Sequence, residues 1–199
     1  MMKNLIQNSI NIAFSYSEYR SHIKSLISKG KSTAKEDNDS LFQYSILNDK
    51  RMDRLDKTLA VSDETSDSVN NLYNPITFLV IAEGWCGDAA QILPILNKIS
   101  ESSKNIALKI VLRDKNERLM DEFLTNGSKS IPKIILVDKH GDVINTWGPR
   151  PSTATQMVLN YKQKNGRIDT TFKKDLQLWY NKDKGFSTQK DIINLLKAS

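Results

Sequence analysis

The chain contains one cysteine, Cys86, in the stretch EGWCGDAAQ at residues 83–91. The stretch follows an apolar run and opens a predicted helix, so the sulfur stands at a helix N-terminus. Unpaired backbone N–H groups and the positive end of the helix dipole favour a thiolate at such a place. We therefore expect Cys86 to be accessible to solvent, with a pKa below the unperturbed value of about 8.5, and to act as a nucleophile near neutral pH.

The neighbours of Cys86 suit a thiol site. Trp85 offers an apolar wall beside the sulfur, and Gly87 leaves room for the approach of a disulfide. Asp88 has two interpretations: it stabilises the helix start while it opposes the thiolate, or it accepts a proton locally. Cys86 is therefore the candidate catalytic residue, and Asp88 is a possible accessory residue.

The elements that would position Cys86 begin after Asn74-Pro75, a dipeptide typical of a boundary. The run ITFLVIA is continuously apolar, which is typical of a strand buried on both faces. The pattern predicts, in chain order, a strand at 76–82, a helix at 87–100, a strand at 106–113, a helix at 115–127, and a hairpin of strands at 132–138 and 143–147. Strands separated by one helix predict parallel pairing, and the hairpin adds an antiparallel edge.

Helical patterns flank this α/β unit. Residues 16–29 place apolar side chains at helical intervals before Gly30, and residues 40–59 do the same. The sequence after about Pro151 is also helix-forming. The polar stretch at 62–71 is interpreted as a short capped helix or a linker.

Arg113 closes the second predicted strand. Ligands in open α/β sheets gather at the carboxyl ends of the strands, so Arg113 is a possible accessory residue of the site. An exposed salt bridge is the alternative interpretation.

The motif around the cysteine resembles that of the thioredoxin family. Trp85, Cys86 and Gly87 follow a buried strand and open a helix, and Pro94 stands at the matching place inside that helix. The WCGD motif, the WGPRP run at 147–151 and the helical N-terminal segment resemble a bacterial branch of thioredoxin-like proteins with a Trp-Cys-Gly-Asp-Ala motif.

A second segment resembles the part of thioredoxin that holds its cis-proline. Ile131-Pro132 stands directly before the predicted strand IILVD. The resemblance implies a cis peptide bond here, which would turn the backbone N–H and C=O of Ile131 toward an extended peptide beside Cys86. Ile131 and Pro132, with Trp85 and Gly87, are therefore expected to bind substrate.

The resemblance covers about residues 75–164 and implies a thioredoxin-like α/β fold, in which helices flank a central mixed β-sheet. It divides the chain into a helical N-terminal extension at 1–72, a thioredoxin-like domain at 73–164 and a C-terminal helical extension at 165–199. Both extensions are expected to pack on the core.

Departures from the family pattern limit the chemistry. Ala89 stands where a dithiol site has its second cysteine, and Val80 replaces the buried acid of thioredoxin. A mixed disulfide at Cys86 therefore has no internal thiol to resolve it. Glu83 replaces the threonine of peroxide-reducing relatives, and Cys-Gly-Asp-Ala differs from the Cys-Gly-Phe-Ser of single-cysteine glutaredoxins. Peroxidase activity and cluster binding are therefore disfavoured, and no cofactor is expected.

Two functions remain open. In the first, Cys86 alone forms mixed disulfides with a disulfide-containing protein or a low-molecular-weight thiol, and an external thiol resolves them. In the second, the protein is a catalytically inactive thioredoxin-like module that binds peptides or proteins.

Composition limits the expected cellular compartment and the classes of partner. The formal net charge is +6, and the excess of basic residues follows Gly148, without a motif for binding nucleic acid. No apolar run reaches the roughly 20 residues of a membrane span, and a lone cysteine fits a reducing compartment. We therefore expect a cytoplasmic protein with no nucleic-acid or membrane partner. His22 and His140 have no metal-ligand motif, so no metal site is expected.

Overall fold

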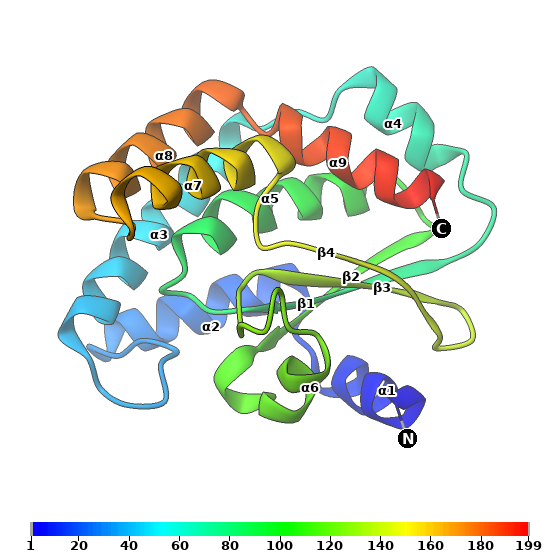
Figure 1. Ribbon diagram of the computed structural model, residues 1–199. Coiled ribbons are helices and arrows are strands. Elements are labelled where there is room, and N and C mark those ends of the chain that lie inside the picture. Colours follow the sequence, from blue (N-terminus) through cyan, green and yellow to red (C-terminus); the bar gives the residue numbers. More distant parts are fainter. Residues whose placement is uncertain (1, 199) are drawn as a thin grey trace.

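β1 (Ile76–Ala82) is the central strand of the sheet, and all of its residues except Thr77 are buried. The computed structural model describes residues 2–198 and places four strands in the order β2-β1-β3-β4 (Figure 1). The other strands are β2 (Ile106–Leu112), β3 (Lys133–Asp138) and β4 (Val143–Trp147). β2 runs parallel to β1, and β3 runs antiparallel to both β1 and β4. This mixed sheet between helices confirms the predicted fold class.

Helices cover both faces of the sheet. In Figure 1, α5 and α9 lie on one side with α7 and α8 farther out, and α1 and α6 lie on the other side. The helices are α1 (Met2–Ile12), α2 (Tyr16–Ser28), α3 (Asp39–Thr58), α4 (Asp63–Asn70), α5 (Gly87–Glu101), the 3₁₀ helix η1 (Arg113–Lys115), α6 (Glu117–Glu122), α7 (Ser152–Asn165), α8 (Thr170–Asp183) and α9 (Phe186–Lys197). The helices predicted at 16–29, 40–59 and 87–100 agree with α2, α3 and α5. α1 lies within the predicted helical N-terminal extension, although the sequence does not predict its own bounds.

The predicted parallel pairing of the third strand is wrong. The segment between β2 and β3 holds only η1 and α6, which are too short to cross the sheet and return the chain to its other end. β3 therefore starts at the end of the sheet where β1 and β2 finish, and its first residue, Lys133, pairs with Ile81 of β1. The helix predicted at 115–127 ends at Glu122. Phe123 already has non-helical angles (φ −127°, ψ 41°), and Asn126 and Gly127 then form a turn with positive φ angles of 50° and 74°.

The link between α1 and α2 joins the sheet. Phe14 forms an antiparallel bridge with Ile110 of β2 through two backbone hydrogen bonds of 2.8 Å. Ser15 then caps α2: its hydroxyl accepts from the Glu18 N–H at 3.3 Å, and the Glu18 carboxylate accepts from the Ser15 N–H at 2.7 Å. This capping box fixes the start of α2 beside β2.

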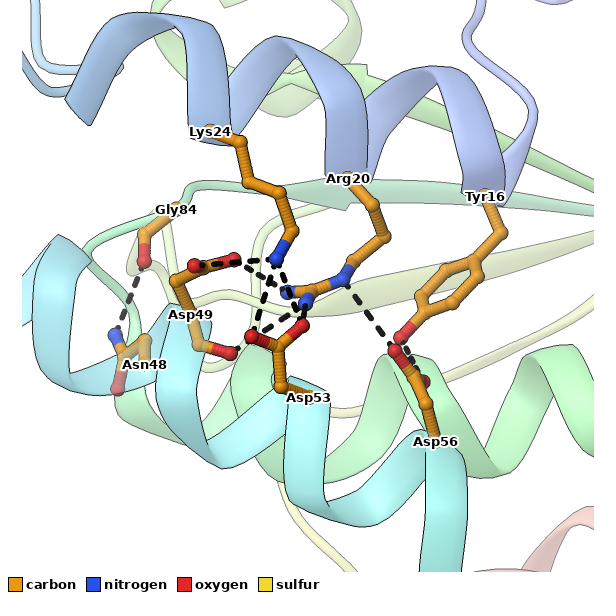
Figure 2. A network of polar contacts seen from close by, with 8 residues as sticks. All are labelled: Tyr16, Arg20, Lys24, Asn48, Asp49, Asp53, Asp56 and Gly84. Atoms are coloured by element: carbon orange, nitrogen blue, oxygen red, sulfur yellow. Dashed lines mark hydrogen bonds and ion pairs between the residues drawn. The ribbon is translucent and has the colours of Figure 1, made fainter. Parts of the chain in front are cut away.

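An ion-pair network centred on the buried side chain of Arg20 joins α2 to α3 (Figure 2). The guanidinium of Arg20 lies 3.0 Å from a carboxylate oxygen of Asp49 and 2.6 Å from one of Asp53. Asp56 is a third partner at 3.5 Å. Lys24 pairs with Asp53 at 2.8 Å from the solvent side of the network. These contacts hold α3 at a fixed place against α2.

The C-terminal helices pack in two ways. α9 joins the main core through Ile192 and Leu196. α7 and α8 form a helical hairpin with an apolar cluster of its own, made of Ala154, Val158, Phe172, Leu176 and Tyr180.

The turn between β4 and α7 passes close to the chain just before β3. Gly148 has a φ angle of 119°, and a methyl group there would overlap the carbonyl oxygen of Pro132. Only glycine fits this position. The turn, which includes a cis Gly148–Pro149 peptide bond, brings Arg150 to the start of α5.

Within residues 2–198, no helix is both long and apolar enough to cross a membrane. The same residues hold no group of three or more His, Cys, Asp or Glu side chains placed to bind a metal ion.

Candidate functional site

Cys86 lies at the start of α5, as the sequence predicts. It is the N-cap residue, and its Sγ accepts from the backbone N–H of Ala89 at 3.5 Å. On its other side Sγ donates to the carbonyl oxygen of Ile131 at 3.4 Å. The Ile131–Pro132 peptide bond is cis, which confirms the expectation for this bond. The sulfur thus lies between the helix start and the segment before β3.

The expected exposure and low pKa of Cys86 are wrong. Only 8% of the residue is exposed, and it belongs to the main apolar core. Burial raises the pKa of the Cys86 thiol to about 12, and the nearby charge of Asp88 adds to this effect. The N–H groups at the helix start and the charge of Arg150 oppose the shift without overcoming it. The increase in pKa caused by burial is therefore larger than the decrease caused by the N–H groups at the helix N-terminus.

Asp88 is buried and forms a hydrogen bond and an ion pair with two residues from other segments. Its Oδ1 accepts from the hydroxyl of Tyr180 at 3.0 Å, and its Oδ2 lies 2.6 Å from the guanidinium of Arg150. Burial raises the pKa of Asp88, and the ion pair and the hydrogen bonds counteract it. Both carboxylate oxygens are therefore engaged in joining α5 to the turn before α7 and to α8. The sequence shows no sign of either partner, since both lie more than 60 residues away.

The space beside Gly87 is filled by side chains. A methyl group at Gly87 would lie 3.3 Å from Nε2 of Gln177 in α8 and 3.7 Å from Nη1 of Arg51 in α3. Because Gly87 has no side chain, Gln177 of α8 and Arg51 of α3 can pack against the backbone next to Cys86. In this conformation the side chains of Gln177 and Arg51 fill the space beside Gly87 through which the sequence predicts the approach of a disulfide.

Trp85 and Arg113 form a pair at the edge of the site. The guanidinium carbon of Arg113 lies 4.9 Å from the centroid of the Trp85 ring, a cation–π contact. Nε of Arg113 also lies 2.8 Å from Oδ1 of Asp114. Arg113 is therefore near the site and in a salt bridge at the same time, which combines the two interpretations of this residue.

Ile131 and Pro132 lie beside Cys86 and are both buried. Ile131 is 7% exposed, and its carbonyl oxygen already accepts a hydrogen bond from the thiol of Cys86. Binding of an extended peptide at these residues would require a rearrangement of the side chains that cover them.

The loop before Cys86 is held by the segments that precede β1. Nδ2 of Asn48 in α3 donates to the carbonyl oxygen of Gly84 at 3.0 Å, as Figure 2 shows. The Gly84 N–H donates to the hydroxyl of Thr33 at 3.0 Å. Asn48 in turn accepts from Arg51 at 2.8 Å. The N-terminal extension thus positions the loop before Cys86, a role that sequence periodicity does not reveal.

Comparison with known proteins agrees with this geometry. Residues 34–168, more than half of the chain, match a family described as Thioredoxin. The chain belongs to the thioredoxin-like family. The matched region includes part of the N-terminal helices, β1 to β4, α5 and α7.

Two solved structures resemble this thioredoxin-like protein over most of its length. An HIV epitope scaffold has 15% sequence identity and a TM-score of 0.61, and the alignment covers 97% of this chain and 98% of that chain. A protein of unknown function, PA1234 from Pseudomonas aeruginosa, has 13% identity and a TM-score of 0.57, with 92% and 98% covered. At these identities the likeness shows the fold alone. No curated protein matches the sequence.

Glu83 is a buried acid of the thioredoxin-like site. The residue is fully buried, and its Oε1 accepts a hydrogen bond from the Asp114 N–H at 2.9 Å. Burial raises the pKa of Glu83 from 4.5 to about 7, against hydrogen bonds from Thr33 and Asp114 that lower it. Glu83 is thus protonated in the folded protein at a pH where the unfolded chain has released the proton.

This shift predicts a pH-dependent effect of Glu83→Gln. As the pH rises from 4.5 to about 7, wild-type Glu83 progressively reduces the free energy of unfolding, because the unfolded chain binds fewer protons there. The full effect is about 3 kcal/mol. Relative to the wild type, Glu83→Gln should therefore gain about this amount of stability between about pH 4 and about pH 8. Urea denaturation at both pH values measures the gain, and a difference independent of pH would contradict the assignment.

Proposed function

We propose that this thioredoxin-like protein is a thiol redox protein in which Cys86 alone forms mixed disulfides with protein or low-molecular-weight disulfides. The observation that supports the proposal is the place of Sγ, at the N-cap of α5 and 3.4 Å from the carbonyl oxygen of Ile131. This arrangement puts one sulfur against helix N–H groups on one side and an extended backbone segment on the other. Trp85, Gly87, Ile131 and Pro132 are the proposed substrate contacts, with Arg113 at the rim.

The proposed reaction has two exchange steps. The Cys86 thiolate attacks one sulfur of a disulfide, the S–S bond of the substrate breaks, and the second sulfur leaves as a thiolate that takes up a proton. A second, external thiolate then attacks the mixed disulfide and restores Cys86. Because the chain has no other cysteine, this second thiol comes from another molecule. We place the protein in the cytoplasm, where reducing thiols are abundant, and in the bacterial branch with the Trp-Cys-Gly-Asp-Ala motif.

The function predicts a covalent adduct at a defined residue. Incubation with oxidised glutathione should give one glutathione adduct on Cys86, seen as a single mass increase of the intact protein and located by peptide mapping. Dithiothreitol should remove the adduct. Cys86→Ser should show no adduct under the same conditions. A wild-type protein that stays unmodified in its folded state, while its urea-unfolded chain is modified, would contradict the redox function.

A peptide-binding or protein-binding module is the second candidate, and the burial and raised pKa of Cys86 favour it. Such a module needs the fold but not the reactivity of the thiol. Pull-down with wild type and Cys86→Ser, under conditions that preserve disulfides, separates the two functions. Clients held equally by both proteins support the binding module, and clients held only by the wild type support mixed-disulfide chemistry.

A further inference from the structure

The start of α5, where Cys86 lies, is covered by α8 of the α7–α8 hairpin, although the proposed reaction requires a substrate sulfur to touch Cys86. On α8, Gln177 lies against Gly87, the residue after the cysteine, and accepts from Gln91 of α5 at 2.9 Å. One helical turn later, the Tyr180 hydroxyl donates to Asp88 at 3.0 Å. α8 therefore covers the first turn of α5, where the thiol lies.

The contacts of α8 with this region are polar. Besides the bonds of Gln177 and Tyr180, Asn181 accepts from Arg54 of α3 at 2.7 Å. Water replaces such hydrogen bonds when they open, so each contributes little net free energy. The apolar side chains of α8 instead pack against α7, in a cluster separate from the main core. Movement of the hairpin as one unit therefore leaves both apolar clusters intact.

The hairpin is bounded by two links with glycines in the left-handed region. Gly148 before α7 has a φ angle of 119°, and Lys184 and Gly185 after α8 have φ angles of 52° and 84°. β4 and α9, on the far sides of these links, belong to the sheet and to the main core. The hairpin is thus a unit inserted between two anchored elements. Its first residue, Ser152, is tied to Asp191 of α9 by hydrogen bonds of 2.8 and 2.9 Å, so the hairpin swings about this point. Such units open at a lower free-energy cost than the whole fold.

We propose that the α7–α8 hairpin is a gate over Cys86, which the bonds of Tyr180 to Asp88 and of Gln177 to Gln91 hold shut. Substrate reaches the sulfur when the hairpin swings away from the start of α5. The purpose of the gate rests on the proposed function. Its opening, however, is a property of the fold and is measured without any disulfide chemistry.

The test is the rate at which iodoacetamide alkylates Cys86 in the full-length folded protein. Tyr180→Phe removes one bond of the gate and keeps the ring in its apolar cluster, and Gln177→Ala removes the other. Each should raise the alkylation rate about three- to tenfold, since each weakens the closed state by the net free energy of one hydrogen bond. Tyr161→Phe is the matched control, because Tyr161 lies on the same hairpin and bonds Asp169, away from α5. It should leave the rate unchanged.

A second measurement uses the wild type alone. Below the unfolding transition, the logarithm of the alkylation rate should rise with urea on a shallower slope than the global unfolding equilibrium, because opening of the gate exposes less surface. A slope equal to that of global unfolding would overturn the gate, and so would Tyr180→Phe and Gln177→Ala rates equal to the wild type.

The gate and the redox function fail in different ways. If the gate opens as described but oxidised glutathione gives no adduct, the redox function fails and the gate stands. If the adduct forms on Cys86 while the variants leave the alkylation rate unchanged, the gate fails and the redox function stands.

Discussion

Iodoacetamide is expected to alkylate Cys86 about a thousandfold more slowly in the folded protein than in the urea-unfolded chain at about pH 8. Only the thiolate reacts, and the folded state raises the pKa of the Cys86 thiol from 9.0 to about 12 through burial and the charge of Asp88. Each pKa unit lowers the thiolate fraction about tenfold at this pH. The measurement is a time course of intact mass in buffer and in urea.

The control for this experiment is Cys86→Ser, which reports any slower modification of other side chains. A folded thiol that reacts within about tenfold of the unfolded one would mean that the sulfur is solvated. That result would restore the low pKa expected from the helix terminus. The thousandfold protection, by contrast, describes a thiol that stays inert until its cover moves.

Arg20→Met is expected to reduce the free energy of unfolding by about 3–5 kcal/mol. The Arg20 side chain is 8% exposed and faces Asp49, Asp53 and Asp56 within 3.5 Å. Its removal leaves three carboxylates close together, with Asp49 itself only 16% exposed. Loss of Arg20 is costly because Asp49 has little contact with water, and the three carboxylates then have only Lys24 among the described residues as a counter-ion, 3.6 Å from Asp49 and 2.8 Å from Asp53. Urea denaturation at neutral pH measures the change.

Lys24→Met is the matched control for Arg20→Met. Lys24 bonds the same Asp53 at 2.8 Å, but its side chain is 49% exposed. Solvent screens such a pair, so the expected loss is below about 1 kcal/mol. Equal losses for the two variants would show that burial does not determine the strength of this network.

The sequence predicts the local features of the site better than its surroundings. The buried strand before Cys86 and the motif around it place the cysteine at a helix start, and the resemblance to thioredoxin implies the cis bond before Pro132. The surroundings of the thiol instead include Gln177, Tyr180 and Arg150, which contact Gly87 and Asp88 of α5 from distant segments. Periodicity shows that those segments are helical, but it does not show which face of α5 they cover.

The direction of β3 illustrates the same limit. A helical pattern between two strands predicts a crossover, and only the true length of α6 reveals that the chain turns back instead. α6 ends at Glu122 because Phe123 leaves the helical conformation, and the left-handed residues Asn126 and Gly127 then form a turn within the predicted helix. The fold class survives this error, because one parallel pair and one hairpin are enough to define it.

The bridge between Phe14 and Ile110 has a consequence beyond the shape of the N-terminal segment. β2 is the outermost strand on its side, and a bare outer strand offers unpaired N–H and C=O groups to any other extended chain. Phe14 satisfies both backbone groups of Ile110 in the middle of that strand. The short connector therefore blocks part of the β2 edge, so that a strand from another molecule cannot pair there and start an aggregate.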